Sequence, residues 1–320
     1  MLIPKSSSVA CQGLSGGWGS HAPAGLASQS HRQYFLAMQN STQPGGLSSA
    51  PFSNPTLPRL APRAYGGFNW IGFGTLYAKE VRRFIAVGTQ TILAPMVTTL
   101  LFLAVFVLAL GHSVDQVGGQ PYILFLVPGL IMMAMTQNAF ANTSSSLMIA
   151  KVQGNIVDLL MPPLSPLEQT IGVAAGGLTR GLAVGLATGL AMWIFVPITI
   201  AHPLFALFHG VMASLLLALI GMLAGIWAEK FDHMAAVTNF VITPLSFLSG
   251  TFYSTERLSP AWKAVAHVNP FFYMIDGFRY GFIGHADGSL AAGIAILCVS
   301  NLVLLVLVHR CFARGYKLKA

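Results

Sequence analysis

The residues of this sequence that could do chemistry are few and do not converge on a catalytic set. Nine histidines are scattered along the chain, and although His202 and His209 stand two helical turns apart, no acid or cysteine joins them. Gly13-Leu-Ser-Gly has part of the pattern of a serine nucleophile elbow, but no strand precedes it. The sequence contains no Walker A phosphate loop. We therefore expect no catalytic residues, no metal site and no bound cofactor, and if ATP is used, another subunit must bind it.

Glycines recur at four-residue intervals in one apolar segment. The series is Gly177, Gly181, Gly185 and Gly189. Gly172 and Gly176 have the same spacing, one position out of that register. Because a stripe without side chains lets another backbone approach closely, the series predicts tight helix packing, against this chain or against a second one. The general tolerance of membrane helices for glycine is the alternative explanation.

Polar residues also occur inside apolar segments. One group closes the second apolar segment and consists of Thr136, Gln137, Asn138 and Asn142. We expect this group to face other helices or a water-filled path, because lipid would not solvate it. Arg180 stands in the third apolar segment, where 181–200 alone supplies a full span, so we favour a place at the inner boundary with the guanidinium reaching for the headgroups. A buried ion pair, for instance with Glu168, is the alternative.

The segment between the second and third apolar segments predicts a short helix over residues 149–160. Pro162, Pro163 and Pro166 end it, because proline cannot continue the backbone hydrogen-bond ladder. A short exposed helix between two spans is suited to contact with a soluble partner. A plain connecting loop fits the same residues equally well.

These residues must be positioned by a protein whose solvent is lipid. Of 320 residues, 54% are hydrophobic and only 8% are charged, and the mean hydropathy is +0.68. A soluble domain has roughly 25% charged residues. The net charge of +8 does not indicate nucleic-acid binding, because the basic residues lie in gaps between apolar segments and do not alternate with aromatics along one face.

Six apolar segments approach the roughly 20 residues that a spanning helix needs. They are residues 89–110, 122–142, a stretch within 171–200, 204–227, 235–248 and 290–308. The fifth is short and interrupted at Pro244, which predicts a partial or kinked span. Residues 251–285 mix apolar, aromatic and charged residues in a way that hydropathy alone does not explain.

Residues 68–87 predict an amphipathic helix at the membrane interface, although an ordinary extension of the first span is the alternative. Its apolar face consists of Trp70, Phe73, Tyr77, Val81, Phe84 and Ile85. Its polar face consists of Lys79, Arg82 and Arg83. Such a helix rests on the cytoplasmic leaflet.

The basic residues predict that both termini are cytoplasmic. The inner side then holds Lys79, Arg82, Arg83, Lys151, Lys230, Arg310, Arg314, Lys317 and Lys319. The outer side holds only Arg257, Lys263 and Arg279. This distribution agrees with the excess of Lys and Arg in cytoplasmic loops.

Residues 1–66 differ from the rest of the chain. They are rich in Ser, Gly, Pro, Gln and Asn and contain no acids, so we expect a disordered tail. A start of translation at Met38 is the alternative. The membrane domain is expected to follow at residues 67–316.

Three stretches before the last span resemble the signature of ABC-2 type permeases, the membrane subunits of ATP-binding-cassette exporters. They are Thr243-Pro-Leu-Ser-Phe-Leu-Ser-Gly-Thr-Phe-Tyr-Ser, Leu258-Ser-Pro-Ala-Trp and Asn269-Pro-Phe-Phe-Tyr-Met-Ile-Asp-Gly-Phe-Arg-Tyr-Gly. The signature positions are Pro244, Gly250, Pro260, Trp262, Asn269, Pro270, Tyr273 and Arg279. Phe125-Leu-Val-Pro-Gly-Leu-Ile-Met-Met also looks typical of the family. The likeness is best with bacterial inner-membrane permeases and with nodulation-factor, polysaccharide and drug exporters, and it covers residues 68–316.

The resemblance implies a fold and a set of partners. The fold is all-α, with six transmembrane helices, an interfacial helix at 68–87 and re-entrant outer helices within 251–285. Residues 151–160 look like the coupling helix that docks on the ATPase, with Lys151, Gln153, Asn155, Ile156, Asp158, Leu159 and Leu160 as its positions. The charged residues that usually precede the family's glycine, here Gly154, are partly replaced by Lys151, Val152 and Gln153.

The expected function is therefore that of a non-enzymatic permease subunit that exports a substrate across the cytoplasmic membrane. Two ATPase subunits and a second permease copy are the implied partners. An ATP-independent secondary transporter is the alternative, but it would show inverted repeats and acids at the midplane, and neither is visible. A membrane-embedded enzyme would need a converging catalytic set. Glycolipid, polysaccharide, peptide and amphiphilic drug all remain open as substrates.

Overall fold

The computed structural model describes residues 67–318, except 111–115, 118 and 255–258. The predicted tail at 1–66 and the alternative start at Met38 lie outside the described residues, as do Arg257 and Lys319 of the orientation argument.

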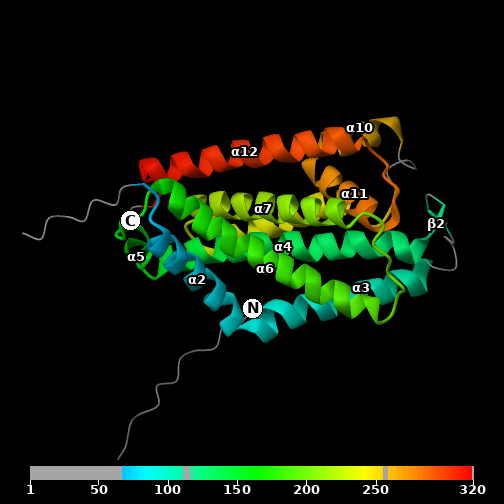
Figure 1. Ribbon diagram of the computed structural model, residues 1–320, viewed down its shortest axis with the longest axis horizontal. Helices are drawn as coiled ribbons and strands as arrows, with labels where there is room; N and C mark the ends of the chain where they lie inside the picture. The colour runs from blue at the N-terminus through cyan, green and yellow to red at the C-terminus, as the bar shows by residue number, and fades with distance from the viewer. Residues whose placement is uncertain (1–66, 111–115, 118, 255–258, 319–320) are drawn as a thin grey trace, which may run out of the picture. The chain divides into compact units, whose positions relative to one another are not determined.

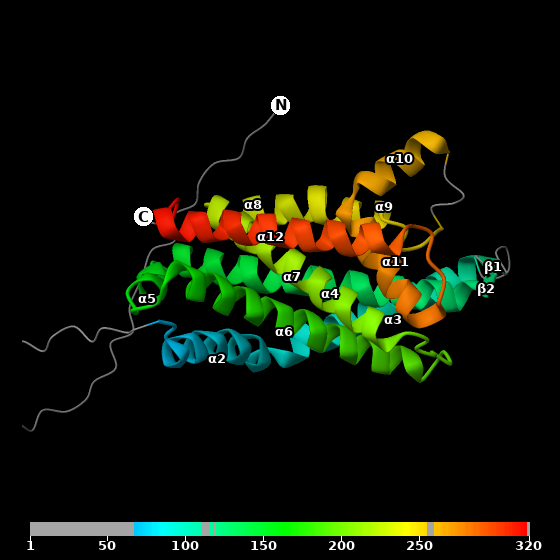
Figure 2. The same ribbon diagram turned by 45° about the horizontal axis from the view of Figure 1, so that its top comes forward.

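The described part is a bundle of long helices, and the all-α character is confirmed. Figures 1 and 2 show α4 (Tyr122–Val152), α6 (Pro166–Trp193), α7 (Pro203–Trp227) and α12 (Leu290–Arg314) running lengthwise beside one another. α3 (Ala94–Leu110) follows the π-helical turn η2 (Thr89–Leu93). Five helical segments of the described chain are long and apolar enough to cross a membrane. The described residues also contain two short strands that pair antiparallel, β1 (Gln116–Val117) and β2 (Gln120–Pro121).

α4 forms the centre of the bundle and packs against both α6 and α7. Its large side chains Phe125, Met132 and Phe140 are fully buried. α3 and α12 instead expose apolar residues such as Leu101, Leu108 and Leu302. A helix that exposes so much apolar surface requires lipid or another protein beside it.

The two glycine registers of α6 pack against two different helices. A Cβ on Gly177 would lie 2.5 Å from Thr143 Cγ2 and 3.1 Å from the Ala139 carbonyl oxygen, both on α4. A Cβ on Gly176 would lie 2.5 Å from Cβ of Glu80, which belongs to α2 (Trp70–Ala86). The missing side chains therefore let α6 approach α4 on one side and α2 on the other.

The members of the main register do not contribute equally. Gly181 faces the Met135 carbonyl oxygen, 3.0 Å from where its Cβ would stand, and Gly185 faces the Met135 side chain. The nearest atom to a Cβ on Gly189 is Ile131 Cδ1 at 3.6 Å, which is an ordinary contact distance. Close approach thus ends before Gly189.

Two predicted boundaries are wrong. α4 does not end at Asn142 but continues to Val152, so the first part of the expected loop is helical. α6 begins at Pro166 because Ser165 and Glu168 form a reciprocal capping box, in which each side chain accepts the other's backbone N–H. It ends at Trp193, inside the predicted stretch 171–200.

The fifth apolar segment is helical throughout, which corrects the expected interruption at Pro244. It consists of α8 (Phe231–Val237), the π-helical turn η3 (Thr238–Ile242) and α9 (Thr243–Leu248). In the turn, the Thr243 N–H donates to the Thr238 carbonyl, five residues back. Proline normally clashes with the carbonyl four residues earlier, and the wider turn directly before Pro244 relieves that clash.

Three short helices lie at the ends of the bundle. α5 (Ile156–Leu160) lies at the same end as the C-terminus of α12, whereas α10 (Pro260–Val268) and α11 (Pro270–Ile283) lie toward the other (Figures 1 and 2). α11 packs on α7, α12 and α4. The predicted loop residues and the predicted signature residues are therefore separated by the length of the bundle.

The structure predicts that Gly177→Ala destabilises the fold and that Gly189→Ala does not. The new methyl group at 177 must push α4 away, and overpacking of this kind costs about 1–3 kcal/mol. Thermal unfolding of the detergent-purified variants measures the difference. Equal midpoints for the two variants would contradict the close approach of α6 to α4.

Candidate functional site

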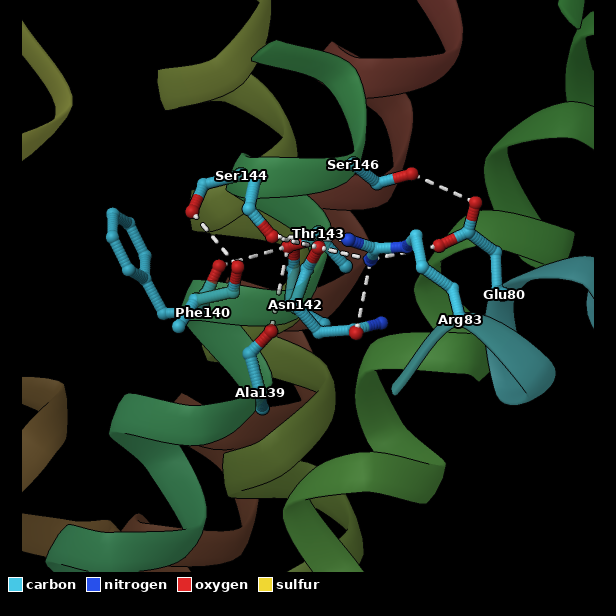
Figure 3. A network of polar contacts seen from close by, with 11 residues as sticks. Glu80, Arg83, Ala139, Phe140, Asn142, Thr143, Ser144 and Ser146 are labelled. Carbon is cyan, nitrogen blue, oxygen red and sulfur yellow. Dashed lines mark hydrogen bonds and ion pairs between the residues drawn. The ribbon is translucent and has the colours of Figure 1, made fainter. Parts of the chain in front are cut away.

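A polar clamp joins α2 to α4 toward the C-terminal end of α4 (Figure 3). The Arg83 guanidinium donates from Nη2 to the Asn142 carbonyl oxygen at 2.7 Å and from Nη1 to Ser145 Oγ at 3.1 Å. Nη2 also forms an ion pair with Glu80 Oε2 at 3.1 Å. The sequence predicted that Arg83 shares the polar face of α2 with Lys79 and Arg82. Lys79 and Arg82 are exposed, but Arg83 points toward α4.

Glu80 is the buried partner in this clamp. Its residue is only 1% exposed, and Ser146 Oγ donates to its second carboxylate oxygen at 2.7 Å. A buried carboxylate requires such partners, since loss of hydration is costly. The buried face of α2 consists of Leu76, Glu80 and Phe84, whereas Trp70 and Ile85 of the predicted apolar face are exposed.

Beside the clamp lies a cavity of about 820 Å³ lined by α2, η2, α3, α4 and one residue of α6. Its polar lining consists of Arg83, Gln90, Thr91, Thr98, Thr99, Gln137, Asn138, Ser145 and Arg180. Its apolar lining includes Pro95, Phe102, Leu130, Met133 and Ala134. The polar end of the second span, which the sequence singled out, is thus divided: Gln137 and Asn138 line the cavity, and Asn142 belongs to the clamp.

Arg180 lies midway along α6, and the helix beyond it is too short to be the full span on which the expected place at the inner boundary rested. α6 ends at Trp193, so the stretch from Gly181 covers only about 20 Å at about 1.5 Å per residue, short of the roughly 30 Å hydrocarbon core. Arg180 Nη2 donates to Asn138 Oδ1 at 3.0 Å. Glu168 is engaged by the Ser165 cap and the Asn69 N–H, and no carboxylate of the described residues lies within ion-pair distance of Arg180.

The candidate coupling segment is divided into two parts. α4 carries Lys151, and a break at Gln153–Asn155 separates it from α5. Gly154 makes this break possible, because its φ of +73° is strained for residues with a Cβ. The single short helix predicted over 149–160 is therefore wrong, although its second half forms.

Three of the predicted coupling residues face inward. Lys151 Nζ donates to the Ile226 carbonyl at 2.8 Å and the Ala228 carbonyl at 2.5 Å, so it caps the C-terminus of α7. Ile156 and Leu159 are 4% and 5% exposed and pack in a cluster that includes Phe312. These side chains hold the segment to the bundle and are not available to a partner.

The exposed surface of this segment includes two apolar residues that are not among the predicted coupling residues. Gln153, Asn155 and Asp158 are exposed, and Leu160 is half-buried. Val157 and Met161 are 53% and 76% exposed and stand one helical turn apart. The four-residue spacing of two apolar residues next to Pro162 was a signal that could have identified them.

The signature residues meet at the other end of the bundle in a structural contact. Arg279 is buried, donates from Nη2 to the Gly250 carbonyl at 2.7 Å, and places its guanidinium 3.7 Å from the Phe125 ring centroid. Asn269 caps α11 at Phe271 N and donates to Ser249 Oγ at 2.9 Å.

The remaining signature residues do not join this contact. Pro270 begins α11, and Tyr273 is buried facing Gly293 of α12. Pro244, Pro260 and Trp262 are exposed. The signature contacts therefore join α11 and the turn at Gly250 to α4.

His202 and His209 both lie against the Phe205 ring but differ in their other contacts. His209 is buried and pairs through Nδ1 with the Phe205 carbonyl oxygen at 2.9 Å, whereas His202 stacks on Tyr280. Within the described residues, no group of three His, Cys, Asp or Glu is placed to hold a metal.

A family model and several known proteins match most of this chain. The sequence model of a family described as ABC-2 type transporter matches residues 72–283. The inner membrane transport permease YadH of Escherichia coli K12 is 37% identical over 251 residues, which cover 78% of this chain and 98% of that protein. Nodulation protein J of Rhizobium leguminosarum bv. viciae is 24% identical over 235 residues, 73% of this chain and 90% of that protein.

The clamp predicts that Glu80→Gln loosens α2. The substitution leaves the Arg83 charge without its carboxylate, at a cost of about 1–3 kcal/mol. Hydrogen exchange of the α2 amides should rise, while the control Lys79→Gln, a charge lost from the exposed face, leaves it unchanged. If the two variants exchange alike, the ion pair does not hold α2.

Proposed function

The chain belongs to the ABC-2 type transporter family, and from that premise we propose that it is the permease subunit of an ATP-driven exporter in the cytoplasmic membrane. The relatives named as transport permeases support this role, which is not enzymatic. We propose that a separate subunit binds and hydrolyses ATP. The chain itself then needs no cofactor.

The observation that carries this proposal is the exposed apolar surface of α5. Val157 and Met161 project from a segment whose other side is anchored by Lys151, Ile156 and Leu159. A segment that is held to the bundle on one side and exposes apolar residues on the other is suited to transmit force from a docked protein. We propose that the ATPase docks there, with Asp158 beside the apolar pair.

We further propose six spans with both termini cytoplasmic. The span added to the five long apolar helices is the fifth apolar segment, Phe231–Leu248, whose continuous helix covers about 27 Å at about 1.5 Å per residue. The excess of Lys and Arg at the end that carries α5 and the C-terminus supports this orientation. α10 and α11 then serve as the re-entrant outer helices.

The assembly that we propose contains two ATPase subunits and two permease copies. The family's architecture implies both pairs, and the apolar residues exposed on α3 give a second copy a surface to cover. ATP-driven closure of the ATPases would then move the two permease halves against each other. Such coupling requires that the ATPase bind the two conformations with different affinity.

A secondary transporter is the second candidate, and acids in the membrane would favour it. Glu80 and Glu168 are buried acids near the inner end, and both are engaged in structural contacts. Export that stops when ATP is removed but continues after collapse of the proton gradient supports the ATP-driven assignment. The opposite result supports the secondary transporter.

We predict that Val157→Asp with Met161→Asp abolishes co-purification with the ATPase and lowers export at least about tenfold. New charge at an apolar contact must be desolvated on docking, and this is costly. Both side chains are exposed, so the permease itself should unfold at the wild-type temperature. Pull-down of the ATPase and transport in vesicles measure the outcome.

The matched control is Tyr316→Asp, which adds the same charge at a residue of similar exposure, 55%, outside the α4–α6 segment. It should keep wild-type pull-down and export. The docking assignment is wrong if the double variant binds the ATPase as the wild type does.

A further inference from the structure

The cavity beside α3 and α4 contains a positive charge, that of Arg180, which no acidic side chain of the described residues neutralises. Arg83 is neutralised by Glu80, its ion-pair partner at 3.1 Å. Arg180 has only the neutral Asn138 amide oxygen as a partner. Its Nε is buried without a hydrogen-bond partner, and so is Nε of Arg83. A guanidinium has five N–H donors and no acceptor, so the site lacks both a negative charge and acceptor oxygens.

The position of Arg180 makes this imbalance costly. The residue lies within its span, where an unpaired cation is poorly solvated. Arg180 also adds to the positive field of Arg83, because both line the same cavity. A ligand carrying oxygen acceptors and negative charge would relieve both deficits at once.

The arginines of the cavity lie toward its end near Ser145, and its largest apolar surface lies toward Leu130. Along α4 the lining changes from Ile149, Ser145 and Asn138 to Met133 and Leu130. The facing chain is mixed, with Phe84 and Val87 near Arg83 and with Thr98 and Thr99 before Phe102. The volume of about 820 Å³ lies in the range of small-molecule sites. This shape suits a molecule with a polar head and an apolar chain.

We propose that the cavity binds an amphiphile with an anionic headgroup, a phosphate or a carboxylate, and that Arg180 binds that headgroup. The apolar chain lies along Phe102, Met133 and Leu130. Guanidinium pairs with either oxyanion through two parallel hydrogen bonds. That this amphiphile is the exported substrate rests on the proposed function. That it binds in the cavity rests on the cavity alone.

Other ligand classes fit less well. A small inorganic anion would match the charge but leave the apolar end unfilled. A cationic amphiphile would place a second charge of the same sign beside Arg180. A neutral sugar headgroup would supply acceptors but leave the arginine charge unbalanced, which is expensive away from water.

The test uses the permease purified in dodecyl maltoside and its thermal unfolding in the presence of dodecyl phosphate. Dodecyl phosphate should raise the unfolding temperature more than dodecylphosphocholine, which has the same chain and phosphate but no net charge, and more than inorganic phosphate. Arg180→Gln should weaken dodecyl phosphate binding about tenfold or more, the loss typical of a charge-assisted hydrogen bond. Arg180→Lys should fall between the two, since it keeps the charge but not the fork.

The matched control is Arg82→Gln, which removes one positive charge from the exposed side of α2, outside this cavity. It should bind dodecyl phosphate as the wild type does. A second variant, Thr98→Phe, adds bulk at an exposed position of the cavity wall and should weaken binding with Arg180 intact. Equal binding of dodecyl phosphate and dodecylphosphocholine by the wild type, or equal losses in Arg180→Gln and Arg82→Gln, would overturn the site.

ATP turnover of the complex with its ATPase separates the two possible sources of the ligand. Stimulation by dodecyl phosphate that is lost in Arg180→Gln supports an exported amphiphile. Binding that depends on Arg180 without any stimulation keeps the anion site, identifies its occupant as a resident membrane lipid, and overturns the substrate assignment. If no ATPase co-purifies but binding persists, the proposed export function fails and the site stands.

Discussion

In hydrocarbon no water is available to satisfy a polar group, so each one must find its partner within the protein. The structure meets this constraint at its main junctions. Glu80 and Arg83 satisfy one another and α4, Lys151 caps the open carbonyls of α7, and Arg279 donates to the Gly250 carbonyl while stacking on Phe125. Each of these contacts joins a neighbouring segment to α4 or to α7. The polar groups of the helical bundle therefore also hold its helices together, and among the described residues the Nε atoms of Arg83 and Arg180 remain without a hydrogen-bond partner.

α4 connects these junctions along its whole length. Its 31 residues extend over about 46 Å at about 1.5 Å per residue, from the Phe125 contact with Arg279 to Lys151 beside α5. The glycines of α6 bring that helix against α4, and α7 packs on its other side. A push on α5 would reach the C-terminal end of α4 through the buried pair Ile156 and Leu159. α11 and the turn at Gly250 are joined to the N-terminal end of the same helix, which gives the proposed coupling a continuous physical route.

Much of the fold follows from sequence because hydropathy and proline or glycine positions act locally. The apolar segments at 89–110 and 204–227 became helices close to their predicted bounds, and the segment at 290–308 became a helix that continues to Arg314. The continuation of α4 past Asn142 was hidden because several of its residues there are polar, and tertiary contacts with α2 and α7 satisfy these residues within the bundle. The fate of Pro244 depended on a π-helical turn that no composition rule predicts. Which coupling residues face inward depended likewise on Phe312 and Leu318, which are distant in sequence from Leu159.

The central claim is that the permease receives its energy through the surface of α5. Photo-crosslinking from an unnatural amino acid at position 157, in membranes that contain the cognate ATPase, measures that contact directly. We expect an ATPase adduct from position 157 whose yield changes with nucleotide, and none from the exposed position 302 on α12. An adduct of equal yield from both positions, or an ATPase that binds and turns over ATP without any adduct from 157, would contradict it.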